Sequence, residues 1–78
     1  MIITSAILDK ARKETGLKIN IWQKGNKCRI YVDGCGYITE DYNDVYGNGT
    51  GYLEGFAYQH TRPGKAGKLR DVIRAIAQ

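Results

Sequence analysis

The sequence predicts a small α+β domain, in which two helices pack on one face of an antiparallel sheet of three or four strands. Apolar residues recur with helical spacing near each end of the chain and alternate along the stretch between them. The length of 78 residues suffices for one hydrophobic core and not for two. Residues 1–78 are therefore expected to form a single domain with the element order α-β-β-β-(β)-α.

The first helix is expected at residues 4–15. Thr4 or Ser5 can cap its start, and Gly16 follows as a left-handed stop. Leu17 is positioned for the apolar contact that accompanies such a stop. The predicted stripe facing the core consists of Ile3, Ile7, Leu8 and Ala11.

Residues 17–33 are expected to form a hairpin whose register can be derived. With Gly25 and Asn26 in a two-residue turn, residues whose numbers sum to 51 face each other. The apolar residues then share one face, and a one-residue slip would mix the two faces. On the apolar face Ile21 is opposite Ile30 and Ile19 is opposite Val32, whereas on the other face Trp22 is opposite Arg29, Asn20 is opposite Tyr31 and Lys18 is opposite Asp33.

A third strand is expected at residues 37–42, after a turn at 33–36, and a fourth at 51–59. Asn48 and Gly49 between them are typical of a hairpin turn, although a longer loop is also compatible with the sequence. Either face of the fourth strand can be the buried one, because Phe56 favours one face and Leu53 the other.

The last helix is expected at residues 66–77, after the break at 62–64. Its apolar residues follow the i, i+3, i+4, i+7 spacing of a helix that faces a core. They are Leu69, Val72, Ile73 and Ile76, and we expect both helices to cover the sheet face that carries Ile19, Ile21, Ile30 and Val32.

The net charge of +4 conceals a segregation of charge along the chain. Residues 1–30 carry seven basic and two acidic side chains, residues 31–58 carry five acidic and no basic ones, and residues 59–78 carry five basic and one acidic. The pattern is therefore +5, −5 and +4, with all six tyrosines in the acidic part. This pattern predicts a bipolar surface, and it argues against a protein that binds phosphate groups over its whole surface.

Few residues are suited to catalysis or metal binding. Cys28, Cys35 and His60 lack the spacing of a zinc site, and the two cysteines are expected to be free thiols. The glycines of residues 47–51 lack the lysine of a nucleotide-binding loop, and residues 41–45 lack the ligands of a calcium loop. We therefore expect neither enzymatic activity nor a cofactor or metal.

Cellular location is predicted from the start of the chain and from its two cysteines. The apolar start is too short to cross a membrane and does not resemble a signal peptide. With two free thiols, these features favour the cytoplasm.

Two parts of the predicted surface are suited to binding a protein partner. One is the outer face of the hairpin, and the other is the tyrosine-, glycine- and asparagine-rich stretch 41–52, whose composition is that of a binding loop. A shielded surface tryptophan and a flexible hairpin are the simpler interpretations. The predicted contact residues are Trp22, Tyr31, Asp41, Tyr42, Asp44, Tyr46 and Tyr52.

Binding of nucleic acid is the alternative. Aromatic and arginine side chains on an open sheet can stack on bases, and basic residues around the start of a helix can contact phosphate. A solvated basic face is the simpler interpretation of the last helix. The candidate residues are Trp22, Arg29, Arg62, Lys65, Lys68 and Arg74.

Two families resemble this chain. The order helix–strands–helix, with lysines opening the last helix, is similar to a double-stranded RNA-binding domain. The stretches INIWQKG at 19–25 and GKLRDVI at 67–73 resemble small phage-encoded anti-CRISPR proteins. That second resemblance implies an inhibitor that occupies a surface of a host nucleoprotein complex, in competition with nucleic acid. We expect a non-enzymatic binding protein of this kind, with a nucleic-acid-binding module as the alternative.

Overall fold

The computed structural model describes residues 3–77, which form two α-helices and one five-stranded antiparallel sheet. The predicted α+β class and the two terminal helices are confirmed, although the sheet contains more strands than the three or four expected. In chain order the elements are α1 (Ser5–Thr15), β1 (Ile19–Lys24), β2 (Lys27–Val32), β3 (Gly36–Thr39), the 3-10 turn η1 (Tyr42–Asp44), β4 (Thr50–Leu53), β5 (Phe56–His60), the 3-10 turn η2 (Pro63–Lys65) and α2 (Ala66–Ile76).

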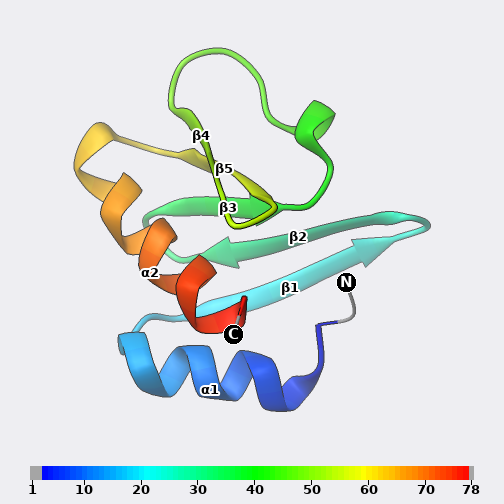
Figure 1. Ribbon diagram of the computed structural model, residues 1–78, viewed down its shortest axis with the longest axis vertical. Coiled ribbons are helices and arrows are strands. Elements are labelled where there is room, and N and C mark those ends of the chain that lie inside the picture. Colours follow the sequence, from blue (N-terminus) through cyan, green and yellow to red (C-terminus); the bar gives the residue numbers. More distant parts are fainter. Residues whose placement is uncertain (1–2, 78) are drawn as a thin grey trace.

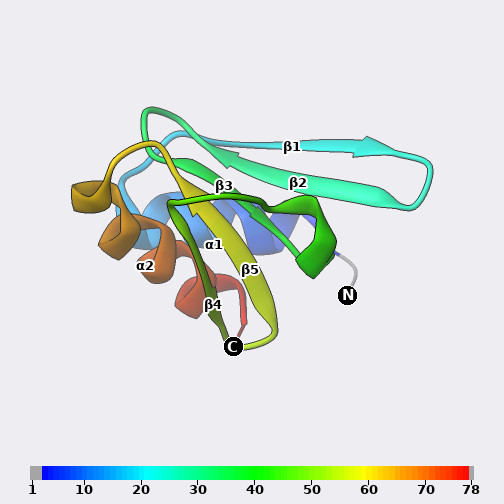
Figure 2. The same ribbon diagram turned by 90° about the horizontal axis from the view of Figure 1, so that it is seen from above.

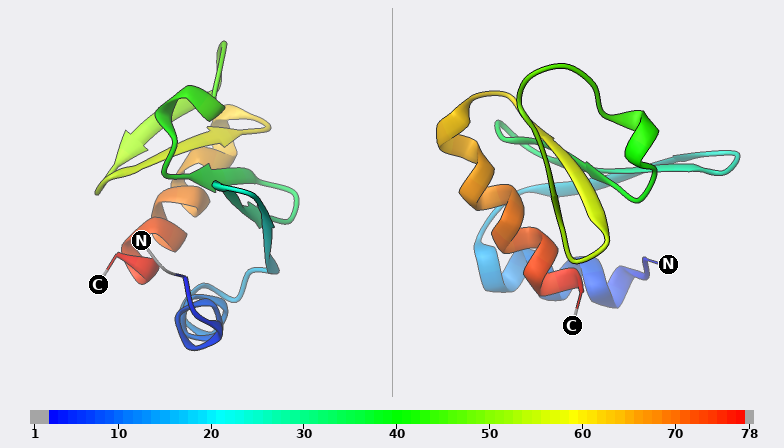
Figure 3. Two further views of the ribbon diagram at one scale, coloured as in Figure 1. Left: turned by 90° about the vertical axis from the view of Figure 1, so that its right-hand side faces the viewer. Right: turned by 45° about the horizontal axis from the view of Figure 1, so that its top comes forward.

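Both helices lie on the same face of the sheet, and residues 41–49 run across the opposite one (Figure 1; Figure 3, left). We call the face covered by helices the inner face and the opposite one the outer face. The strand order is β1-β2-β3-β5-β4, so β1 and β4 are the two edges. The chain thus passes from β3 over the outer face before it returns as β4.

The helices begin and end within one residue of the predicted bounds. The Thr4 side chain caps α1 by accepting a hydrogen bond from the Ile7 amide, and Gly16 ends the helix at φ 71°. The side-chain nitrogen of Lys10 donates to the carbonyl of Ala75, which ties α1 to the end of α2. The two helices therefore contact each other, and α2 also contacts β3, β4 and β5.

The core lies between the helices and the inner face, as predicted. Every residue of the predicted α2 stripe is buried, together with Leu8 and Ala11 of α1. On the sheet, Ile19, Ile30 and Val32 are buried and Ile21 is half-buried. Ile38, Phe56 and Tyr58 from β3 and β5 complete this core.

The predicted register of the first hairpin is confirmed in full, since β1 and β2 pair with residue numbers that sum to 51. Trp22 and Tyr31 consequently lie on the outer face. The guanidinium of Arg29, which is opposite Trp22 in this register, lies over the ring of Tyr37 at 4.3 Å from its centroid.

The prediction of one strand over residues 51–59 was wrong, because these residues form the hairpin of β4 and β5. Its turn consists of Glu54 and Gly55, with φ values of 53° and 87°, which is the two-residue geometry that matches the strand twist. The turn reverses the chain, so Leu53 and Phe56 are paired, with Phe56 buried in the core and Leu53 half-buried against it. Asn48 and Gly49 lie in the loop before β4.

The third strand ends earlier than predicted, at Thr39 instead of residue 42. Asp41 stops the extended chain, because its carboxylate accepts a hydrogen bond from the Asn43 amide at 2.9 Å and starts η1. Residues 41–49, which we call the crossing segment, therefore leave the sheet and pass over its outer face.

Candidate functional site

The outer side of the molecule carries all of the large aromatic side chains that are well exposed within residues 3–77. Their exposed fractions range from 39% for Tyr31 and 40% for Trp22 to 58–65% for the remaining three. We call this set the aromatic face, and it consists of Trp22, Tyr31, Tyr42, Tyr46 and Tyr52. The two surfaces that the sequence predicted separately, the outer hairpin face and the stretch 41–52, thus lie on the same side of the sheet.

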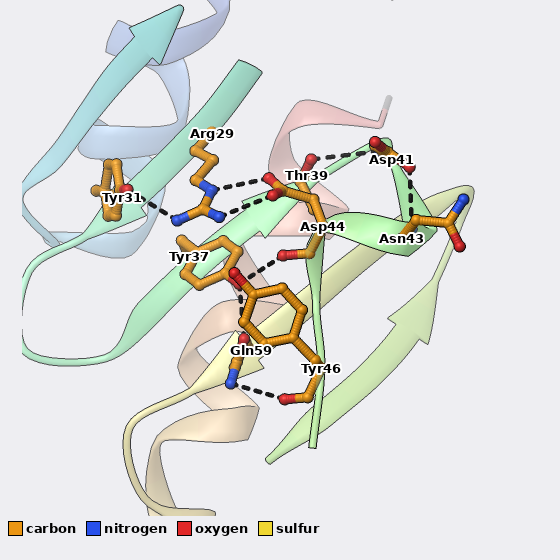
Figure 4. Close-up of polar contacts among 9 residues, drawn as sticks. All are labelled: Arg29, Tyr31, Tyr37, Thr39, Asp41, Asn43, Asp44, Tyr46 and Gln59. Carbon is orange, nitrogen blue, oxygen red and sulfur yellow. Dashed lines mark hydrogen bonds and ion pairs between the residues drawn. The ribbon is translucent and has the colours of Figure 1, made fainter. Parts of the chain in front are cut away.

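The crossing segment is fixed to the sheet by an ion pair between Arg29 of β2 and Asp44 of η1. Nε and Nη2 of Arg29 each donate to one carboxylate oxygen of Asp44, both at 2.7 Å (Figure 4). The Asp44 side chain is almost fully buried and that of Arg29 is about one-fifth exposed. Two parallel charge-assisted hydrogen bonds with this geometry are strong and orient both partners.

The ion pair shifts the protonation equilibria of both residues. Hydrogen bonding from Arg29 lowers the pKa of Asp44 below its ordinary value, although burial acts in the opposite direction. The hydrogen bond to Asp44 is also the largest cause that raises the pKa of Arg29, followed by the one to Tyr31. Both groups are therefore charged in the folded protein at neutral pH.

Tyr37 and Gln59 form a second anchor beside the ion pair. The Tyr37 hydroxyl lies 2.7 Å from the carbonyl oxygen of Asp44 and 2.6 Å from Oε1 of Gln59, so two acceptors share one proton. The amide of Gln59 donates to the carbonyl of Tyr46 at 3.0 Å. Burial raises the pKa of Tyr37, while Arg29 over its ring lowers it by less.

Sequence reasoning missed these two residues as supports of the site. Tyr37 and Gln59 are paired in the register of β3 and β5, and both point to the outer face. A correct placement of β5 was needed to find them. The only sequence signal was the concentration of tyrosines, which does not tell an exposed tyrosine from a supporting one.

The remaining contacts hold the outer tyrosines and the ends of the crossing segment in place. The rings of Tyr42 and Tyr52 meet edge to face with centroids 5.7 Å apart, and Tyr31 contacts Tyr37 at 5.9 Å. At the far end, the His60 amide donates to the carbonyl of Gly49 at 2.7 Å. The crossing segment, which carries Tyr42 and Tyr46, is therefore anchored at both ends.

Two predicted contact residues have roles that differ from the expected one. Asp44 is buried against Arg29, so its charge is not offered to a partner, and Arg29 is likewise occupied. Asp41 is exposed as expected, although one of its oxygens caps η1. Of the seven predicted contact residues, six remain at the surface and Asp44 supports them from below.

The residues predicted to bind nucleic acid are divided between opposite sides of the molecule. Trp22 and Arg29 belong to the outer face, whereas Lys68 and Arg74 are on α2, which packs against the inner face. Arg62 precedes η2 and Lys65 ends it, directly before the start of α2. The six residues therefore do not form one continuous surface.

Neither the two cysteines nor His60 belongs to the aromatic face. Cys28 and Cys35 are both free thiols, with Cys35 buried and the pKa of Cys28 raised by burial. His60 ends β5, and its buried Nδ1 has no hydrogen-bond partner within residues 3–77. Among those residues, no three histidine, cysteine, aspartate or glutamate side chains gather in a group suited to a metal ion.

Comparison with known proteins finds no matching family model, no similar curated protein and no similar solved structure. Within the described part of the chain, neither helix has the length and apolar character needed to cross a membrane. The functional interpretation therefore depends on the geometry of the aromatic face.

Proposed function

We propose that this chain is a non-enzymatic, cytoplasmic binding protein that attaches to another protein through its aromatic face. The observation that carries the proposal is the placement of Trp22, Tyr31, Tyr42, Tyr46 and Tyr52 on one side of the sheet, opposite both helices. Exposed tyrosine and tryptophan side chains contribute large contact areas at a low entropic cost, and they dominate the energies of protein interfaces.

The anchored crossing segment supports this proposal. A binding loop that is ordered before it meets its partner loses less conformational entropy on binding. The ion pair holds the side chain of Asp44, while the Tyr37 hydroxyl and the Gln59 side-chain amide bind the main-chain carbonyls of Asp44 and Tyr46. The buried polar contacts thus orient the exposed rings.

The charge around the crossing segment favours a basic partner surface. Asp41 in this segment and Glu54 in the turn between β4 and β5 are exposed, and the guanidinium of Arg29 beneath the segment is paired with Asp44. Acidic groups repel phosphate and attract lysine and arginine. The resemblance to anti-CRISPR proteins implies such a partner, namely a host nucleoprotein complex whose basic groups normally hold nucleic acid.

Affinity capture with matched variants tests the proposal. The tagged wild-type protein, a Tyr42→Ala/Tyr46→Ala variant and a Lys68→Ala/Arg74→Ala control would be incubated with a lysate of the native source, and bound proteins identified by mass spectrometry. All four side chains are exposed, so the variants should fold. We expect a partner that the wild type and the control retain and the tyrosine variant loses. Equal retention by all three would refute the site.

Nucleic-acid binding remains the second candidate because Trp22 is exposed on a sheet face. A fluorescence anisotropy titration with short RNA and DNA at two salt concentrations separates the two functions. Binding that weakens steeply with salt would favour nucleic acid. We expect no such binding, because the candidate residues for nucleic acid are divided between the two sides of the molecule.

A further inference from the structure

The free edge of β1 is a second feature that points to a ligand. β1 is the first strand of the sheet order, and within residues 3–77 it pairs with β2 alone. The turn end of the β1–β2 hairpin extends beyond the helices (Figure 1; Figure 2). Residues 22–27, which form this end, are all exposed. The opposite edge, β4, has only four residues, one of which is Gly51. β1 has six residues and contains neither proline nor glycine.

The register shows which main-chain groups of β1 point away from β2. The Asp33 amide donates to the Lys18 carbonyl, so even-numbered residues of β1 form the hydrogen-bonded pairs with β2. The amides and carbonyls of Ile19, Ile21 and Gln23 therefore point toward the open edge. The guanidinium of Arg12 confirms this direction, because it reaches the Ile19 carbonyl from outside the sheet at 2.6 and 3.0 Å.

Arg12 thus closes the first position of the edge, whereas no other part of residues 3–77 pairs with Ile21 and Gln23 on that side. Beside the closed position, Arg12 and residues 17–20 line a shallow groove. An added strand would pair with Ile21 and Gln23 and place a side chain in this groove. It would also cover Ile21, which is half-buried at the rim of the core.

The charges along β1 indicate which strand would fit. Lys18 precedes the strand and Lys24 ends it, both exposed, and no acidic side chain occurs within β1. Both lysines are even-numbered, so they share the outer face with Trp22. Lysines on an edge oppose pairing with a second copy of the same chain. They attract a strand that carries carboxylates at the matching positions.

We propose that the edge of β1 accepts an extended acidic segment of the protein partner as a sixth strand. The added strand would direct acidic side chains outward, toward Lys18 and Lys24, and apolar side chains inward, toward Ile21. This inference rests on the proposed function, because the strand would belong to the protein that the aromatic face contacts. Main-chain pairing would supply affinity, and the lysines would supply selectivity.

A short peptide in which glutamate alternates with valine is a suitable probe. In ¹⁵N-labelled protein we expect the amides of Ile21 and Gln23 to exchange rapidly before addition and to become protected after it. The amides of Asn20 and Trp22, which face β2, are expected to be protected throughout. The same peptide with lysine for glutamate, or with alternate amides N-methylated, should not bind.

Gln23→Pro is the matching change in the protein, since proline removes an amide that points to solvent. We expect about tenfold weaker peptide binding or more, while Gln23→Ala binds as wild type does. The circular dichroism spectrum checks that both variants are folded. The inference is overturned if the peptide does not protect the amides of Ile21 and Gln23 from exchange, or if the lysine peptide binds equally well. It is also overturned if sedimentation shows that the protein is a dimer.

The two proposals fail in different measurements. If Gln23→Pro retains the captured partner while Tyr42→Ala/Tyr46→Ala loses it, the added strand is refuted and the aromatic face stands. If the tyrosine variant retains the partner, the proposed function is refuted whatever the peptide does.

Discussion

Arg29 and Asp44 lie fifteen residues apart in the sequence and join β2 to η1 through two hydrogen bonds of 2.7 Å. Because the pair lies under the crossing segment, it links the stability of the domain to the position of the exposed tyrosines. An acid and a base that the sequence assigns to two different binding surfaces are thus partners in one support.

Removal of one partner is expected to destabilise the fold. Asp44→Ala should lower the free energy of unfolding by about 3 kcal/mol, the lower end for a broken buried pair, because Arg29 retains some contact with water. Arg29→Lys should lower the free energy of unfolding by a smaller amount, because lysine keeps the positive charge. The loss should still exceed about 1 kcal/mol, because lysine lacks the planar guanidinium that donates two parallel hydrogen bonds. Urea denaturation measures both values.

Asp71→Ala is the control for that series. Its partner Arg74 lies 3.6 Å away and both side chains are more than half exposed. Such pairs contribute about 0–1 kcal/mol. Equal losses for Asp44→Ala and Asp71→Ala would contradict the role of the buried pair.

The Arg29–Asp44 pair also predicts how stability responds to acid. In the folded protein the pKa of Asp44 lies below its ordinary value, so its contribution is fully present above the unfolded pKa of about 3.9. That contribution should be lost as the pH falls below this value and through the lowered pKa. Arg29, whose pKa is raised, stays charged throughout and adds no slope. Urea unfolding between pH 7 and pH 2.5 should show a steeper decline in the wild type than in Asp44→Asn, and parallel curves would disagree with this assignment.

Tyr37→Phe is expected to loosen the crossing segment with little change in shape. The hydroxyl holds the Asp44 carbonyl and Gln59 together, so its loss should cost about 1–2 kcal/mol. Because the pKa of Tyr37 is raised, this tyrosine should ionise above the ordinary value of about 10. In an absorbance titration at alkaline pH, the wild type should therefore show a tyrosinate signal at the highest pH values that Tyr37→Phe lacks. If the variant instead loses the tyrosinate signal that appears at the lowest alkaline pH, the burial of this hydroxyl is contradicted.

The first hairpin was predictable because its turn and its alternating pattern agree. Gly25 and Asn26 fix the pairing, and Ile19, Ile21, Ile30 and Val32 fix the face, so a single register satisfies both. The second hairpin was not predictable from the sequence, because Asn48 and Gly49 give a stronger turn signal than Glu54 and Gly55. Glutamate seldom adopts a positive φ, and only the tertiary pairing of β4 with β5 requires it there.

The candidate site was predictable in its exposed residues and not in its supports. Tyr42, Tyr46 and Tyr52 belong to a stretch whose composition identifies a surface. The contact between Asp44 and Arg29 joins two segments that no local pattern relates. A charged residue in a polar loop is normally solvated, so its burial follows only from the path of the crossing segment over the sheet.

Gly51 of β4 is expected to tolerate no side chain. It is paired with Tyr58, and a Cβ atom at this position would overlap the Tyr58 ring, whose hydroxyl accepts a hydrogen bond from Arg70 of α2. Gly51→Ala should therefore destabilise the domain by about 1–3 kcal/mol, because Tyr58 is buried and cannot turn aside freely. Gly64→Ala is the matched control, since a Cβ there meets nothing within 4 Å and its backbone is not left-handed. Thermal unfolding of the two variants measures the contrast, and similar midpoints would show that β4 can move away from β5 at little cost.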